Sequence, residues 1–104
     1  MSPNPLLAGL RPTHPGEVLR EDILPALARS KVEIAALLGV SRRQLYNILE
    51  ERQPITPPMA LRIGKPTGSR PERWLAMQQA YDLRLAQASI GPELNSIPTL
   101  QAAE

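Results

Sequence analysis

Hydrophobic residues in the middle of the chain recur every three or four positions, which is the spacing of one face of an α-helix. From Lys31 to Glu51 this spacing predicts two short helices that share an inner face. The residues expected on that face are Ile34, Leu37, Leu38, Val40, Leu45, Ile48 and Leu49. Because little more than a turn fits between the two helices, we expect them to form a compact pair.

Polar residues and one glycine mark where these helices begin and where the chain turns. A capping box, in which two side chains bond each other's backbone amides, is expected at each start. The pairs are Ser30 with Glu33 and Ser41 with Gln44. Gly39 lies between the helices, where a residue without Cβ can take the left-handed conformation and turn the chain sharply. The segment is therefore predicted to be a helix-turn-helix. Its structural positions are Ala35, Gly39, Val40, Leu45 and Ile48.

A further helix is predicted before this pair. Pro15 suits the first turn of a helix, and Thr13 or His14 can cap it. The apolar stripe of this helix is Val18, Leu19, Ile23, Leu24 and Leu27. Pro25 lacks the amide hydrogen that an unbroken helix requires, so we expect a break or kink just before it.

A fourth helix follows the pair. Thr56 precedes two prolines, which is a strong start signal, and the helix should run from about Pro57 to Lys65. Pro66 and Gly68 are expected to end it there. Met59, Leu61 and Ile63 are expected to contribute to the core.

The fifth helix is predicted to be the longest. Ser69 and Glu72 have capping-box spacing, Pro71 fits the first turn, and the helix should continue to about Ala88. Its apolar stripe is Trp74, Leu75, Met77, Tyr81, Leu83 and Leu85. We expect this helix to provide much of the contact between two copies of the chain, with Trp74 and Tyr81 as the candidate dimer residues.

The predicted helices define one all-α domain over residues 13–88. Residues 1–12 contain prolines without a sustained period and are expected to form a flexible N-terminal arm. Residues 89–104 scatter glycine, proline and polar residues, and we expect a flexible C-terminal tail. A chain of 104 residues suits one small core, and with aromatics at only 3% that core must be mainly aliphatic.

Composition excludes several classes of function. There is no cysteine, and His14 has no second ligand at metal spacing, so we expect no metal site and no cofactor. No nucleophile with an adjacent base and no glycine-rich phosphate loop is present, so we do not expect an enzyme. No apolar run approaches the length of a membrane span and no export signal is visible, so we expect a cytoplasmic protein. The net charge of +2 is mild, and a site for a polyanion must be a local patch.

Such a patch is predicted on the second helix of the helix-turn-helix. Arginine matches the paired acceptors of guanine, and asparagine or glutamine matches adenine in the major groove. The base-reading candidates, all within the first two turns, are Arg42, Arg43, Gln44 and Asn47. The candidates for contacts to the DNA backbone are Lys31, Ser41 and Tyr46. Two other assignments stay open, because Gln44 can be used in its capping box and Arg42 can bind a phosphate. The plainest alternative is a helical hairpin whose arginines face solvent.

The sequence also resembles a known family. Four segments of this chain carry the resemblance, in order from His14 to about Gln87: HPGEVLREDIL, IAALLGVSRRQLYNIL, ITPPMALRIGK and PERWLAMQQAYDL. Together they resemble the HigA/VapI antitoxin branch of the XRE (Cro/C1-type) helix-turn-helix family. The resemblance implies a five-helix, lambda-repressor-like domain that acts as a dimer on a palindromic operator in double-stranded DNA. It also implies an antitoxin that represses its own operon and neutralises a RelE/HigB-like mRNA interferase.

Two departures from the family bear on its partners. Pro66, Thr67 and Gly68 replace an apolar helical continuation, and the two terminal arms match no family motif. Two other functions remain: a free-standing transcription factor of phage-repressor type, and a helical adaptor that binds only protein. For a toxin, we favour contacts to the first helix and the N-terminal arm, away from the base-reading residues.

Overall fold

The computed structural model describes residues 12–102, and every regular element in that range is helical. The elements are α1 (Pro15–Val18), η1 (Leu19–Ile23), α2 (Leu24–Leu27), α3 (Lys31–Leu38), α4 (Arg42–Leu49), α5 (Pro57–Thr67) and α6 (Pro71–Leu94). Because α1, η1 and α2 follow one another without a break, they form one N-terminal helical segment. The predicted all-α domain of five helices is confirmed over the described range.

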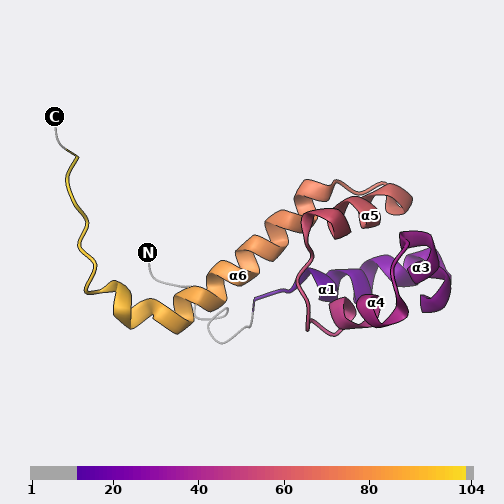
Figure 1. Cartoon of the computed structure of the whole chain (residues 1–104), viewed down its shortest axis with the longest axis horizontal. Helices are drawn as coiled ribbons and strands as arrows, with labels where there is room; N and C mark the ends of the chain where they lie inside the picture. Colours follow the sequence, from indigo (N-terminus) through magenta and orange to yellow (C-terminus); the bar gives the residue numbers. More distant parts are fainter. Residues whose placement is uncertain (1–11, 103–104) are drawn as a thin grey trace.

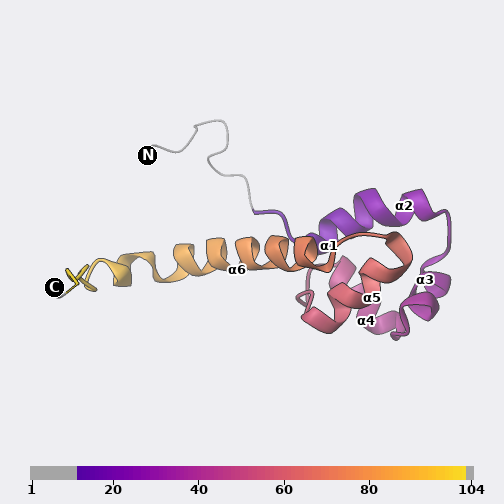
Figure 2. The same cartoon turned by 90° about the horizontal axis from the view of Figure 1, so that it is seen from above.

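The chain consists of a helical body and one long projecting helix. The elements from α1 to α5 pack together, and α6 begins against α5 and then extends away from the body (Figures 1 and 2). Its first turns contribute Trp74 and Gln78 to the buried interior, whereas its later residues are exposed. The far part of α6 therefore has no cover from the other residues between 12 and 102.

The N-terminal helical segment has the predicted cap and an irregular turn where a break or kink was expected. The Nδ1 atom of His14 accepts a hydrogen bond of 2.9 Å from the amide of Gly16, and Pro15 occupies the first turn. Ahead of Pro25 the chain forms a π-helical turn, in which the amide of Leu24 bonds the carbonyl of Leu19. Because proline has no amide hydrogen, the regular bonding pattern cannot continue through it. The expected disturbance at Pro25 is therefore a widened turn, and the helix continues.

The core is aliphatic, as predicted, with one tryptophan at its edge. Its members are Leu19, Leu24, Ile34, Ala35, Leu38, Leu45, Ile48, Leu49, Ile55, Met59, Ala60, Ile63 and Trp74. Two predicted core residues are not in it, because Leu37 is 56% exposed and Leu61 is 63% exposed. Leu37 still borders a small cavity beside Leu27 and Pro66, but most of its side chain faces solvent.

The junction of α5 and α6 differs from the sequence prediction. Pro66 does not end α5, which continues to Thr67 and stops at the left-handed Gly68. The hydroxyl of Thr67 donates a 2.6 Å hydrogen bond to the carbonyl of Ile63, which supports this last turn. The predicted capping box of α6 is also absent: its N-cap is Arg70, without a side-chain bond. The hydroxyl of Ser69 instead accepts a 2.8 Å bond from the indole Nε1 of Trp74.

The end of α6 also differs from the sequence prediction. The helix was expected to stop near Ala88, but it continues to Leu94 with Pro92 inside its last turn. A proline so close to the end removes little, because it lacks only one amide and the helix is about to stop. Residues 89–94 are therefore helical. The division into an arm of residues 1–12, a domain of 13–88 and a tail of 89–104 stays a prediction, and residues 1–11 lie outside the described range.

Candidate nucleic-acid interface

The first helix of the helix-turn-helix begins at a complete capping box. The amide of Glu33 donates a 3.1 Å hydrogen bond to the hydroxyl of Ser30, and the amide of Ser30 donates back to the Glu33 carboxylate at 3.4 Å. This reciprocal pair satisfies two amides that a helix start leaves without a partner. The predicted start of α3 is confirmed.

The second helix begins at only half of the predicted box. The hydroxyl of Ser41 accepts a 3.0 Å bond from the amide of Gln44, but α4 has no return bond from the Gln44 side chain. The prediction of a complete box here was wrong. Because the return bond is absent, the side-chain amide of Gln44 is exposed to solvent and is not used to cap the backbone. This favours the base-reading alternative for Gln44.

The turn between α3 and α4 is built as the sequence predicts. Gly39 has φ 72° and ψ 32°, the left-handed conformation that favours glycine. The amide of Val40 donates a 3.0 Å bond to the carbonyl of Ala35, which closes the end of α3. Ala35 itself is buried where the two helices pack, and Leu45 and Ile48 of α4 are buried with it. The structural positions of the motif are therefore where the sequence places them.

The outward face of α4 brings the polar candidates together. Arg42, Arg43 and Gln44 are exposed, Tyr46 is 38% exposed and Asn47 is partly buried. All of them except Gln44 border a shallow open hollow on the surface, which is lined by Ser41, Arg42, Arg43, Tyr46, Asn47, Glu50 and Arg52. Within residues 12–102, neither Arg42 nor Arg43 forms an ion pair with a carboxylate. Their guanidinium groups are therefore available to acceptors outside the chain.

The start of α3 lies beside this hollow. The Nζ atom of Lys31 stands 5.5 Å from the centre of the Tyr46 ring, so one cation–π contact joins α3 to the outer face of α4. The N-terminal amides of α3 and the Lys31 ammonium thus form a positive edge next to the base-reading candidates. A phosphate fits such an edge, and this placement supports the backbone-contact role predicted for Lys31 and Tyr46.

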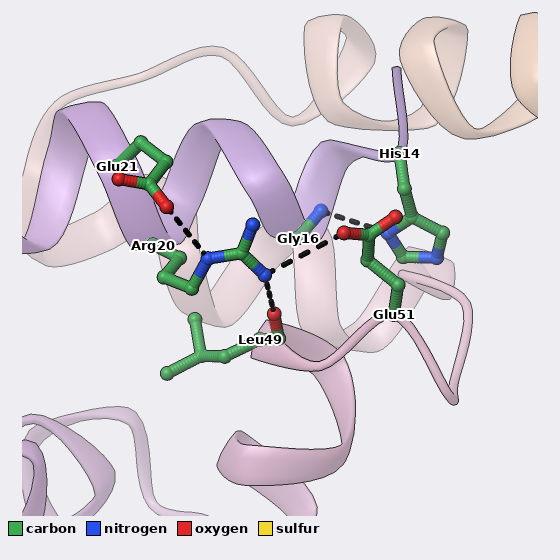
Figure 3. Close-up of polar contacts among 6 residues, drawn as sticks. All are labelled: His14, Gly16, Arg20, Glu21, Leu49 and Glu51. Atoms are coloured by element: carbon green, nitrogen blue, oxygen red, sulfur yellow. Dashed lines mark hydrogen bonds and ion pairs between the residues drawn. The ribbon is translucent and has the colours of Figure 1, made fainter. Parts of the chain in front are cut away.

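The other end of α4 is held by the N-terminal helical segment (Figure 3). A guanidinium nitrogen of Arg20 donates to the carbonyl of Leu49, the last residue of α4, and also contacts the carboxylate of Glu51 at 3.5 Å. The Nε atom of Arg20 bonds Glu21 at 2.9 Å, and this bond is the main reason that the pKa of Arg20 is raised. A cation at a helix C-terminus satisfies carbonyls that the helix leaves free.

His14, the cap of α1, is placed beside this anchor and is buried. Its ring packs edge-on against Tyr81 of α6, with 4.8 Å between ring centres. Burial lowers the pKa of His14, opposed by the carboxylates of Glu51 and Asp82 and by a backbone hydrogen bond with Gln53. The neutral form is the one that accepts the amide of Gly16 at Nδ1.

Gly16 allows the close approach of α1 to α4. A Cβ atom built on it would lie 2.0 Å from the carbonyl oxygen of Ile48, so any larger residue would push the two helices apart. The sequence shows this glycine only as part of a helix start. Its contact joins residues far apart in the chain, and no local pattern reveals it.

Three arginines of this region were missed by reasoning from the sequence. Arg52 shares the hollow with the base-reading candidates and pairs with Glu50 at 2.9 Å. Arg20 holds the end of α4, and Arg62 of α5 bonds the end of α3. Their positions after or outside the motif gave no signal, except that Arg52 follows α4 within a few residues.

The candidate dimer residues are not both at the surface. Trp74 is 2% exposed and lies in the core of this chain, which argues against the predicted contact with a second copy. Tyr81 is partly buried against His14 and keeps some surface. An indole that fills the protomer's own core has no area left for a partner.

Among residues 12–102, no group of three histidine, cysteine, aspartate or glutamate side chains could hold a metal ion. Over the same range, no helix is both long enough and apolar enough to span a bilayer.

These features define a class of protein: a helix-turn-helix domain whose second helix carries arginine, glutamine and asparagine side chains on its outer face. No family model matches the chain. A curated relative does: virulence-associated protein I of Dichelobacter nodosus is 40% identical over 74 residues, which cover 71% of this chain and 68% of that protein.

Solved structures agree with this relative. The antitoxin HigA of Pseudomonas aeruginosa with its higBA promoter is 33% identical, with a TM-score of 0.82, and the match covers 88% of this chain and all of that one. The antitoxin GraA in complex with its operator is 39% identical, also with a TM-score of 0.82, over 98% of this chain and all of the other. The chain belongs to the HigA/VapI antitoxin branch of the Cro/C1-type helix-turn-helix family.

Proposed function

We propose that this protein is an antitoxin that binds the operator of its own operon and silences a toxin encoded beside it. The observation that carries the proposal is the outward-facing polar set on α4, in which Arg42, Arg43 and Gln44 are exposed and Asn47 is partly buried. The chain that carries these residues matches the structures of two antitoxins that were solved with promoter or operator DNA. In this proposal α4 enters the major groove, and Lys31 and Tyr46 hold the adjoining backbone.

We further propose that the protein acts as a homodimer on a palindrome. One helix-turn-helix contacts only a few base pairs, so useful specificity requires two copies with half-sites about one helical turn, or ~34 Å, apart. The exposed part of α6 supports such an assembly. Leu83, Ile90 and Leu94 are spaced by seven and four residues, which places them on one face, and each is at least 42% exposed. A second copy would cover this apolar stripe.

The proposed toxin is a RelE/HigB-like mRNA interferase, and the proposed location is the cytoplasm. If toxin and operator are to bind at once, the toxin must use a surface away from α4. We assign it to the N-terminal helical segment, where Glu21 and Asp22 are exposed and can face a basic partner. Such a partner can raise operator affinity by joining sites or lower it by blocking α4.

DNA binding is tested with the region upstream of the gene. Footprinting of the purified protein should protect a palindromic site, and the matching duplex should bind more tightly than a scrambled duplex of equal composition at the same salt. Equal binding of both duplexes would contradict the repressor function and favour an adaptor that binds only protein.

Toxin neutralisation is tested by expressing the neighbouring small gene alone and together with this one. We expect growth arrest with the neighbour alone, and both rescue and a co-purifying complex on co-expression. If operator binding is specific but the neighbour never arrests growth, or is not rescued, a free-standing repressor replaces the antitoxin.

A further inference from the structure

The end of α3 is held by an arginine from another helix. Nη1 of Arg62, on α5, donates a 2.9 Å hydrogen bond to the carbonyl of Leu38 and a 3.3 Å bond to the carbonyl of Gly39. These two residues are the last of α3 and its C-cap. Carbonyls at this position have no partner within the helix, and a cation there also complements the helix dipole. Arg62 therefore contributes both hydrogen bonds and charge to the helix end.

Its contact with the turn is tight. A Cβ atom built on Gly39 would lie only 2.7 Å from Nη1 of Arg62, so the guanidinium packs directly against the glycine backbone. The helix that carries Arg62 is itself fixed, because its neighbours Met59, Ala60 and Ile63 are buried in the core. The Arg62 side chain thus holds the turn in a fixed position relative to α5.

The position of the turn determines the position of the DNA-facing residues. Only Val40 separates Gly39 from Ser41, the N-cap of α4, and the base-reading candidates Arg42 and Arg43 follow at once. Any movement of the turn must move the start of α4, which is the end that enters the groove. Base-edge hydrogen bonds tolerate only small displacements, because their strength falls steeply with distance and angle.

We propose that Arg62 is a positioning residue for operator recognition. By bonding both carbonyls at the end of α3, it fixes the angle at which α4 presents Arg42, Arg43 and Gln44 to the bases. This inference rests on the proposed DNA-binding function. It assigns to α5, which lies outside the helix-turn-helix, a share of the sequence discrimination.

The test compares Arg62→Met with Arg62→Lys and with a matched control, Lys65→Met. Methionine keeps an aliphatic stem but has no donor, and lysine keeps the charge without the planar fork of donors. Lys65 is exposed on the same helix, so its variant removes an equal charge from α5. Each full-length protein is titrated against the footprinted operator duplex and the scrambled duplex at several salt concentrations, well below its melting temperature.

We expect Arg62→Met to weaken operator binding by between about threefold and thirtyfold, as the loss of charge-assisted hydrogen bonds implies. Binding of the scrambled duplex and the salt slope should stay as in the wild type. Arg62→Lys should restore part of the discrimination, and Lys65→Met should leave it unchanged. Backbone amide signals of Gly39 and Val40 should shift in Arg62→Met alone.

Three results would overturn the assignment. An equal loss on both duplexes with a smaller salt slope would make Arg62 a phosphate contact. Unchanged operator preference in a folded but less stable Arg62→Met protein would make its role structural only. If Lys65→Met lowers discrimination as much as Arg62→Met, the effect is one of charge. A wild-type protein without operator preference would instead refute the proposed function itself.

Discussion

Arg43 is the side chain on which we expect base recognition to depend most directly. It is exposed in the first turn of α4 and forms no ion pair with the described residues. Arg43→Ala should therefore cost ~1–3 kcal/mol on the operator and relax preference at one base position. Titration against operator and scrambled duplexes at fixed salt measures this. An equal loss on both duplexes would assign Arg43 to the phosphate backbone.

Lys31 provides the matched comparison. Its ammonium stands over the Tyr46 ring at the edge of the α4 face, where a phosphate can lie. Lys31→Ala should weaken operator and scrambled DNA alike and reduce the salt slope by about one counterion. A loss confined to the operator would contradict the backbone role.

His14 makes stability depend on pH in one direction. Its folded pKa lies below the ordinary value of 6.5, so between these two values the unfolded chain binds more protons. Stability is therefore complete above about pH 6.5 and decreases as the pH falls through the folded pKa. Thermal melting between pH 5 and 8 should show this decrease, and His14→Asn, which can still cap Gly16, should melt lower but with a flatter pH dependence. An equal slope in both proteins would show that other groups cause it.

At the scale of elements, the turn of the helix-turn-helix is the most sensitive point. Ala35 is buried at the helix crossing, and Ala35→Leu should overpack it at a cost of roughly 1–3 kcal/mol. Gly39→Val places a β-branched residue at φ 72° and drives its Cβ toward Arg62. Both variants should melt at lower temperature and lose DNA binding.

Ala36→Leu is the control for this prediction, because Ala36 is exposed on the same helix. It should melt like the wild type. If Ala35→Leu and Gly39→Val also melt unchanged, the crossing is less tightly packed than the structure shows.

The elements that sequence could predict are those whose signals are local. The cap at Ser30, the left-handed Gly39 and the small Ala35 each act within a few residues, and the structure has all three in place. Leu37 and Leu61 were misplaced because their burial depends on which neighbouring helix covers the edge of a stripe. No periodicity contains that information.

The error at the end of α5 has a different cause, because the contact that matters there is local. Pro66 was expected to stop α5 near Lys65, but the helix continues to Thr67, whose hydroxyl bonds the Ile63 carbonyl. In the candidate site, the outward residues of α4 followed from the pattern. The anchors Arg20 and Arg62 did not, because each reaches a carbonyl more than twenty residues away in the chain.

At the scale of the whole molecule, the exposed stripe of α6 predicts the assembly. Leu83→Glu puts a charge into the stripe and should convert a dimer into a monomer, with a matching loss of operator affinity. Ala88→Glu adds the same charge on the other side of the helix and should leave the dimer intact. Sedimentation measures both. A dimeric Leu83→Glu protein would place the interface elsewhere.

The buried indole of Trp74 is an intrinsic fluorescent probe of core packing. It is the single tryptophan of the chain, and it borders a cavity lined by Val18, Ile23 and Met77, none of which belongs to the DNA-facing surface. Its fluorescence should shift to longer wavelength when the core opens to water and should be insensitive to DNA on α4. Tryptophan emission can thus distinguish two kinds of variant without a label. The emission maximum should shift in variants whose core has opened, and it should not shift in variants that have lost only DNA binding.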